Sequence, residues 1–315
     1  MLKRKAIRKI TITTITVCLL LMIYLMPGDI NEKNVLQTNV EVEHAEKMSK
    51  CKVYLLNDED LLVRASIAVF GDNTLEDKIK NIINNLMKTS NELIPNGLNA
   101  IIPKNTTILG IQIDEGIVSV NFSKEMLDIE EKLEERMTEA IAFSLLELDG
   151  ITGVSLYVDG KNISELFDSK IPNIITKDWG INKRYDLKHK KDIKKFVVYY
   201  IDEIEDEKYY VPITKYVNDD RDKIKIIIED LSSSYIYEPN LVSFLNQNTE
   251  LINYEIDNDI MTLNFNNSIF MSDGEILEEV VYSIMYSVFD NYNVEEVILK
   301  VNNEEIVKKS IKDLE

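Results

Sequence analysis

The side chains best suited to chemistry in this sequence are carboxylates that stand in short runs. The runs are Asp58-Glu59-Asp60, Glu130-Glu131 with Glu134-Glu135, and Asp202-Glu203 with Glu205-Asp206-Glu207. Paired carboxylates can serve as general acid and general base, or bind Ca²⁺ weakly. The calcium-loop spacing D-x-[DN]-x-[DN]-G does not occur in the sequence, and acidic runs are typical of solvated turns and helix faces. We therefore expect no catalytic, metal-ligating or cofactor-binding residue among them.

Other reactive side chains are few. The 315 residues include two His and two Cys, which leaves little material for zinc sites or for Ser-His and Cys-His nucleophiles. His44 and His189 have no carboxylate or Cys at a spacing that would indicate a metal or catalytic site. Cys51 is expected to be a free thiol, the alternative being an intermolecular disulfide. Ten Gly leave little room for a glycine-rich phosphate loop, so the composition favours a non-enzymatic protein.

The charge balance is strongly acidic, with 36 Lys+Arg against 55 Asp+Glu and a net charge of −19. This balance argues against nucleic-acid binding, because phosphate contacts need cations. Five of the cations lie in residues 1–9, so the rest of the chain carries 31 basic against 55 acidic side chains, or −24. A surface of that sign is repelled by anionic headgroups and wall polymers and suits a protein partner.

The N-terminus predicts a membrane anchor. Residues 1–9 form a basic tail, and residues 10–26 carry no charge over 17 positions, which is the short end of a membrane span. The positive-inside rule then places the tail in the cytosol and the rest outside. A cleaved signal peptide and a lipoprotein signal ending at Cys18 are the alternatives. Residues 27–51 are polar and read as a tether.

An internal repeat organises the remainder into a first domain at 52–163 and a second at 196–315, with equivalent positions 143–145 apart. In each copy the pattern predicts strand, strand, helix, hairpin, helix, strand. The hairpins read NTTILGIQIDEGIVSVNF from Asn105 and NTELINYEIDNDIMTLNF from Asn248, with turn residues between alternating apolar positions. Thr74, with Asp77 three positions later, is a cap-like start for the first helix, and a Ser272–Glu275 pair resembles a capping box for the last helix. We predict an α+β fold, with two helices on one face of each sheet.

The segment between the copies, residues 164–195, is weakly periodic and turns basic from Lys183 onward. A solvated connector is the simplest interpretation, and the sharper one is a basic face that contacts acidic surface. Trp179, the only Trp, is expected to pack this connector onto a domain.

The first copy resembles the GerMN-domain family. Ile102-Pro103, Thr106, the strand Val118 to Ser123, and the ending Gly153-Val154 through Asp159-Gly160 carry the resemblance. The second copy departs from the pattern, because Phe244-Leu245 replaces Ile-Pro and Asn302-Asn303 replaces Asp-Gly. The resemblance implies tandem small modules similar to ring-building motifs, with no catalytic residues and no cofactor.

Through this resemblance we expect a single-pass membrane protein that supports a sporulation or germination transenvelope complex by protein–protein contact. Its expected partners are other sporulation or envelope membrane proteins, with self-association as a further option. In a sporulating cell its domains would occupy the intermembrane space. A wall-associated glycan-binding module or hydrolase that uses the acidic runs is the alternative, and a ligand-sensing domain is a third.

Overall fold

The computed structural model describes residues 48–70, 74–88, 93–167, 170–233 and 240–314. The predicted tail at 1–9, the anchor at 10–26, Cys18 and His44 lie outside these residues. Within the described part, no helix has both the length and the apolar character needed to span a bilayer. Residues 47–315 form one compact unit with its own core.

The predicted element order is confirmed in both copies. The first copy contains β1 (Met48–Leu56), β2 (Leu62–Phe70), α2 (Leu75–Asn85), β3 (Ile108–Asp114), β4 (Ile117–Phe122), α3 (Glu134–Leu146), β5 (Gly153–Val158) and β6 (Lys161–Asn162). The second contains β8 (Ile193–Ile204), β9 (Glu207–Asn218), α4 (Lys223–Ser232), β11 (Leu251–Asp257), β12 (Ile260–Phe265), α5 (Glu278–Phe289), β13 (Glu296–Val301) and β14 (Glu304–Ser310). Strands β6, β14, β7 (Arg184–Asp186) and β10 (Leu241–Val242) are additional to the predicted order.

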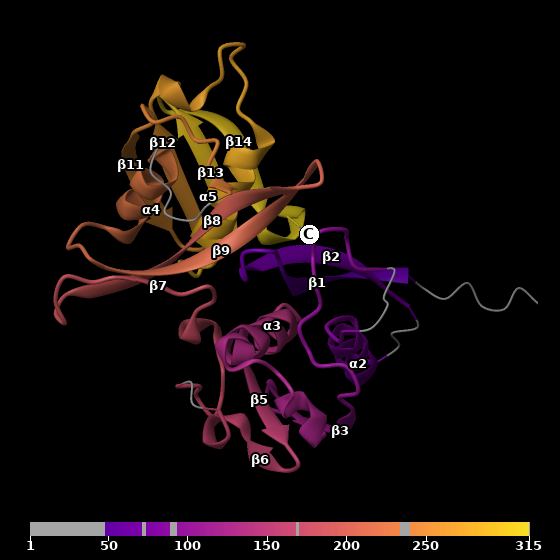
Figure 1. The fold of residues 1–315 in the computed structure, drawn as a ribbon. Helices are drawn as coiled ribbons and strands as arrows, with labels where there is room; N and C mark the ends of the chain where they lie inside the picture. Colours follow the sequence, from indigo (N-terminus) through magenta and orange to yellow (C-terminus); the bar gives the residue numbers. More distant parts are fainter. Residues whose placement is uncertain (1–47, 71–73, 89–92, 168–169, 234–239, 315) are drawn as a thin grey trace, which may run out of the picture. The chain divides into compact units, whose positions relative to one another are not determined.

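The way the strands assemble corrects the expectation of one sheet per copy. The first hairpins of both copies join in a central sheet of order β1-β2-β9-β8-β10, and β7 also pairs with β9. The later strands form two separate four-stranded sheets, β3-β4-β5-β6 and β11-β12-β13-β14 (Figure 1). Strands β8 and β9 bury residues on both faces. The two hairpins meet where Arg64 of β2 pairs with Tyr210 of β9.

The outer sheets have the same register in both copies. In each, the predicted hairpin is antiparallel, and its second strand pairs in parallel with the strand after the helix. The turns are equivalent too: Asp159-Gly160 and Asn302-Asn303 are two-residue turns in which both residues have positive φ. Asn tolerates that conformation better than most residues, which explains how the second copy keeps the turn without the Gly.

The helix caps show one prediction confirmed and one wrong. Thr74 caps α2, because its hydroxyl accepts a hydrogen bond from the Asp77 N–H. The Ser272–Glu275 pair does not cap α5, which begins at Glu278. Instead the Glu275 N–H donates to the Asp273 carboxylate, and Gly274 takes a φ of 86°, so this stretch is used in a turn before the helix.

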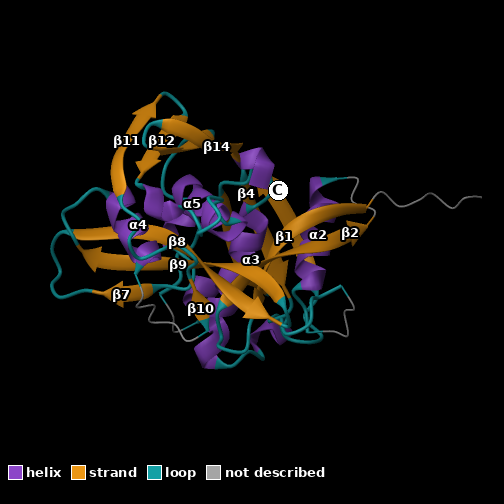
Figure 2. Ribbon diagram, turned by 90° about the horizontal axis from the view of Figure 1, so that it is seen from above, coloured by secondary structure: helices purple, strands orange, loops and turns teal. Residues whose placement is uncertain are grey.

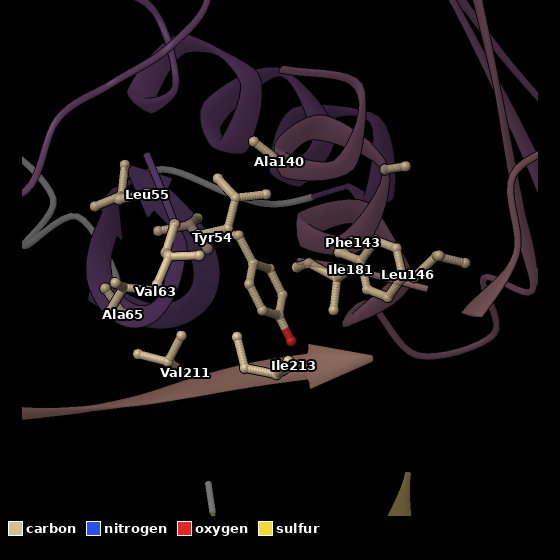
Figure 3. Close-up of a cluster of buried hydrophobic side chains, with 14 of the residues drawn as sticks. Tyr54, Leu55, Val63, Ala65, Ala140, Phe143, Leu146, Ile181, Val211 and Ile213 are labelled. Carbon is tan, nitrogen blue, oxygen red and sulfur yellow. The ribbon is translucent and has the colours of Figure 1, made fainter. Parts of the chain in front are cut away.

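Helix α3 packs between the central sheet and the outer sheet of its copy, rather than on one open face (Figures 1 and 2). Tyr54 of β1 lies against Phe143 of α3, with ring centroids 6.0 Å apart and nearly perpendicular. Val211 and Ile213 of β9 cover the same cluster from the second copy (Figure 3). Each such apolar side chain stabilises the fold by about 1.5–3 kcal/mol on burial. The core therefore runs continuously across the repeat.

The predicted tether and connector are shorter than expected. Strand β1 begins at Met48, inside the proposed tether, and β8 begins at Ile193, inside the proposed connector. The connector itself is tied to both copies: Ile175 bridges Val154 of β5, and β7 pairs with β9. Trp179 is partly buried against the core, as expected.

Candidate functional site

The predicted acidic runs lie in turns and at a helix start, and two of them meet. Asp60, in the β1–β2 turn, and Glu135, in the first turn of α3, line one hollow of about 380 Å³. Each is paired with a cation: Lys132 lies 3.2 Å from Asp60, and Lys183 lies 2.7 Å from Glu135. Ion-paired carboxylates of this kind are poor candidates for an acid–base pair. The third run surrounds the β8–β9 turn.

The other singled-out residues have structural surroundings. His189 is exposed, and its Nδ1 lies 2.8 Å from the Lys191 carbonyl. Cys51 is half-buried in β1 opposite Ile67. Among the described residues, no three His, Cys, Asp or Glu side chains are grouped so that they could hold a metal ion.

A larger hollow of about 540 Å³ lies beside α4 in the second copy. Its wall includes Lys215, which contacts both carboxylate oxygens of Asp230 at 2.7–2.8 Å and the Tyr200 hydroxyl at 2.8 Å. The Tyr200 hydroxyl in turn donates to Asp230. Because these groups satisfy one another, a ligand would have to displace an existing ion pair, and we assign none to this hollow.

The most developed polar structure is the junction between the two copies, where each copy repeats one motif. The Tyr54 N–H donates to the Ser144 hydroxyl at 2.9 Å, and the Tyr54 hydroxyl donates to Glu147 at 3.0 Å. In the second copy, the Tyr199 N–H donates to Ser287 at 3.0 Å, and the Tyr199 hydroxyl donates to Asp290 at 2.6 Å. In this motif a serine on the helix fixes the strand backbone, and a carboxylate one turn later fixes the tyrosine.

The two motifs meet through cations. Arg64 of β2 binds Glu147 at 2.6 Å, and its guanidinium lies 4.7 Å from the ring centre of Tyr286 in the second copy. Lys177 of the connector lies 3.5 Å from Asp290. Burial is the main cause that raises the pKa of Tyr54 well above its ordinary value, and the carboxylates of Glu147 and Asp290 add to it. This cluster links both copies and the connector.

Glu147 makes the stability of this junction dependent on pH. Burial is the largest single influence and would raise the pKa of Glu147, but the charges of Arg64 and Lys177 and the hydrogen bonds from Arg64 and Tyr54 together hold the pKa below the ordinary 4.5. The folded protein then binds fewer protons than the unfolded chain, so this contribution is present above about pH 4.5 and is lost as the pH falls through the lower folded-state pKa.

We accordingly expect Glu147→Gln to lower the free energy of unfolding at pH 7 and to flatten its decline below pH 4.5. Urea titrations at several pH values measure both effects. Parallel pH profiles for the variant and the wild type would contradict the assignment.

Asn182, in the connector, joins the two copies at the point where their strands separate. Strands β2 and β9 share one register pair, Arg64 with Tyr210. Beyond it the Asn182 amide accepts from the Leu62 N–H at 2.9 Å and donates to the carbonyls of Leu62 and Pro212 at 2.8 and 2.9 Å. One buried side chain thereby replaces the backbone ladder between the copies.

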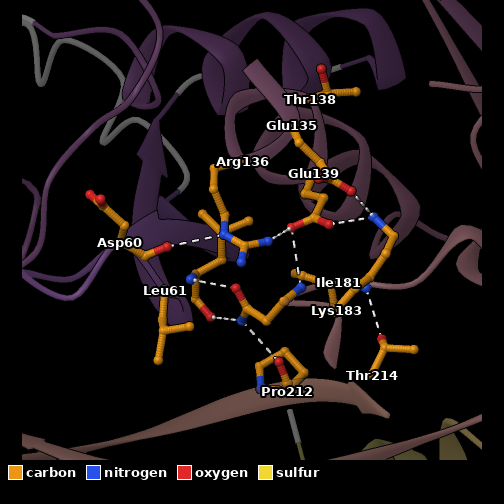
Figure 4. Close-up of polar contacts among 12 residues, drawn as sticks. Asp60, Leu61, Glu135, Arg136, Thr138, Glu139, Ile181, Lys183, Pro212 and Thr214 are labelled. Atoms are coloured by element: carbon orange, nitrogen blue, oxygen red, sulfur yellow. Dashed lines mark hydrogen bonds and ion pairs between the residues drawn. The ribbon is translucent and has the colours of Figure 1, made fainter. Parts of the chain in front are cut away.

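Glu139 of α3 anchors the connector beneath this point. Its side chain is fully buried and accepts from Arg136 at 2.7 Å, from Lys183 at 2.6 Å and from the Asn182 N–H at 3.1 Å (Figure 4). Lys183 is itself buried and lies 3.6 Å from the ring centre of Trp179. For Lys183, these contacts agree with the interpretation of the basic connector as a face that contacts acidic surface.

The sequence analysis did not identify Asn182 or Glu139. A signal existed for Glu139, because it shares a helical face of α3 with Ala142, Phe143 and Leu146, where a buried carboxylate needs a partner. No local signal marks Asn182, since its partners lie 30 and 120 positions away.

Each copy also presents the same free edge. Strands β3 and β11 are terminal in their four-stranded sheets, and each carries a register shift, at Ile108/Gly110 and at Leu251/Asn253. The extra residue is Leu109 in one and Ile252 in the other, and each is 53% exposed. Bulges commonly protect edge strands from unwanted pairing. Both bulges therefore leave a large apolar side chain exposed.

The comparisons with known proteins agree with the tandem organisation. Residues 52–164 and 197–307 match the Germane family, described as "Sporulation and spore germination". The spore germination protein GerM of Bacillus subtilis (strain 168) is 28% identical over 220 residues, which are 67% of this chain and 60% of that protein. The chain thus aligns with about three fifths of the length of this relative.

A solved structure of the tandem GerMN domains of the sporulation protein GerM from Bacillus subtilis matches with a TM-score of 0.75. It is 25% identical, and the match covers 82% of this chain and 92% of that one. The α+β fold with two tandem modules is therefore shared.

Proposed function

Because the chain belongs to the Germane family, described by sporulation and spore germination, we propose that it is a non-enzymatic scaffold that supports a sporulation complex. The similarity to GerM supports the sporulation-related role. The rigid junction between the copies supports the scaffold. The acidic runs give no support for catalysis, because Asp60 and Glu135, which line the same hollow, are both ion-paired.

The observation that carries this proposal is that two equivalent edges are held in a fixed relation. The shared sheet, the Tyr–carboxylate cluster and Asn182 join the copies, which supports a fixed spacing of β3 and β11. Partners that bind both edges gain affinity from the fixed spacing, because the second contact is intramolecular. We propose envelope proteins of the sporulating cell as these partners, with self-association and ring-like assembly as further forms of the same contact.

The location is part of the proposal. The basic tail at residues 1–9 and the uncharged segment at residues 10–26 support attachment to the cytoplasmic membrane with the tandem modules outside it. In a sporulating cell that position is the space between two membranes.

The edges are tested by the paired substitution Leu109→Ser and Ile252→Ser. Both side chains are half-exposed, so we expect little change in stability but a loss of co-purifying envelope proteins from sporulating cells and a sporulation defect. Each single variant should retain part of the binding. Ile311→Ser, at 51% exposure outside the edges, is the matched control and should behave as wild type.

Normal sporulation after deletion of the gene would overturn the role, and normal partner recovery with the double variant would overturn the surface. Binding to purified peptidoglycan that is lost on replacing Asp60 and Glu135 would instead favour the glycan-binding alternative.

A further inference from the structure

The tip between β7 and β8 combines exposed apolar side chains with lysines. Residues 184–193 are ten consecutive exposed residues. Three of them are large and apolar: Tyr185, Leu187 and Ile193 are 65%, 38% and 43% exposed. Apolar side chains that protrude together from a folded unit commonly mark an interaction surface.

Lysines surround these apolar side chains. Lys188, Lys190 and Lys191 are exposed at the tip, and none of the described ion pairs includes them. Asp186 and Asp192 are the acidic residues of the same run, so the tip has a net positive charge in a chain of net charge −19. At physiological ionic strength charges are screened beyond about 8 Å, so a contact at the tip depends on the local charge rather than on the whole protein.

Asn218, at the end of β9, holds the tip in one conformation. Its amide oxygen accepts from the N–H groups of Lys188 and His189 at 2.7 and 3.1 Å. Its amide nitrogen donates to the carbonyls of His189 and Lys191 at 3.1 and 2.6 Å. The tip is therefore preorganised, which lowers the entropy lost when it binds.

The strand registers place the tip far from the point where the chain enters the unit. Met48 lies level with Phe70, six positions along β2 from Arg64, and Arg64 is opposite Tyr210. The tip adjoins Asn218, eight positions from Tyr210 in the other direction. At roughly 3.3 Å per residue the separation is up to about 45 Å along the sheet. The tip and the beginning of β1 thus lie toward opposite ends of the central sheet.

We propose that this tip docks on a lipid bilayer that contains anionic headgroups. Lysines attract the headgroups, and Leu187 and Ile193 insert at the boundary with the acyl chains, while Tyr185 stays stacked on Tyr216 of β9 with ring centroids 4.7 Å apart. A bilayer suits the tip better than a protein socket, because a protruding run of exposed residues fits a deformable surface without a shaped counterpart. The inference does not depend on the sporulation role.

The test uses residues 47–315, which form a compact unit with its own core, and co-sedimentation with vesicles. We expect binding to vesicles of phosphatidylglycerol and phosphatidylcholine, and none to phosphatidylcholine alone. Lysines near an anionic surface contribute about tenfold or less each, so Lys188→Glu/Lys190→Glu/Lys191→Glu should weaken binding on the order of 100-fold. Leu187→Ser/Ile193→Ser should weaken it at every salt concentration.

The matched control is Lys104→Glu/Lys161→Glu/Lys312→Glu, which changes the net charge equally at exposed sites outside the tip. It should retain most of the binding. Equal losses in the two triple variants, or wild-type binding that ignores lipid charge, would overturn the proposal. So would a tip-dependent self-association that accounts for the sedimentation without vesicles.

Discussion

Lys183→Met should destabilise the folded unit by about 3–5 kcal/mol, because it leaves the fully buried Glu139 carboxylate without one of its two cations. Removing one partner of a buried ion pair is costly, since the remaining charge keeps its desolvation penalty. The Trp179 ring also loses the ammonium group that lies 3.6 Å above it. For a unit of this size the loss corresponds to a fall in Tm on the order of 10 °C.

The measurement is urea unfolding followed by tryptophan fluorescence, since Trp179 is the only Trp and lies at this junction. Adding Glu139→Gln to Lys183→Met should cost less than the sum of the two single changes, because the double variant no longer buries an unpaired charge. Lys132→Met is the control: its pair with Asp60 is exposed, and we expect a change under 1 kcal/mol. Equal effects of Lys132→Met and Lys183→Met would refute the role of the buried pair.

The elements predicted from sequence are those whose signals are local. The hairpin from Ile108 to Phe122 was predictable because alternation and a two-residue turn occur within 15 positions. The α2 cap at Thr74 was predictable for the same reason. Because the second copy has the same sequence pattern, the same elements were predicted there. The error at Ser272 shows the limit of this approach, because a capping-box spacing also suits a turn stabilised by Asp273.

The assembly of the elements was not predictable from the same signals. Strand β2 pairs along its length with β1 and also meets β9 at Arg64 and Tyr210, and nothing local in β2 indicates this second partner. The junction depends on residue pairs separated by 30 to 145 positions, among them Asn57 with Asp202 at 2.7 Å. The partners come from different parts of the chain: Asn57 from the first copy and Asp202 from the second, and Asn182 from the connector. The site is thus a property of the tandem arrangement and absent from the pattern of either copy alone.

Asn182→Gly should loosen the two copies from each other and lower the free energy of unfolding by about 3–5 kcal/mol. The substitution removes three buried hydrogen bonds and leaves the Leu62 N–H and the carbonyls of Leu62 and Pro212 unpaired, at about 1–3 kcal/mol for each buried group. Glycine is the informative replacement because Asn182 has a φ of 48°, where an alanine would add backbone strain to the measured effect.

Asn302→Gly is the matched control, because Asn302 has a φ of 50° in an exposed turn and bonds there to Asn267. We expect it to change stability by less than about 0.5 kcal/mol. Small-angle scattering of the two variants separates local from global effects, since only Asn182→Gly should broaden the distribution of distances between the copies. If both variants scatter and unfold alike, Asn182 does not couple the copies, and a partner that binds both β3 and β11 would gain nothing from their fixed spacing.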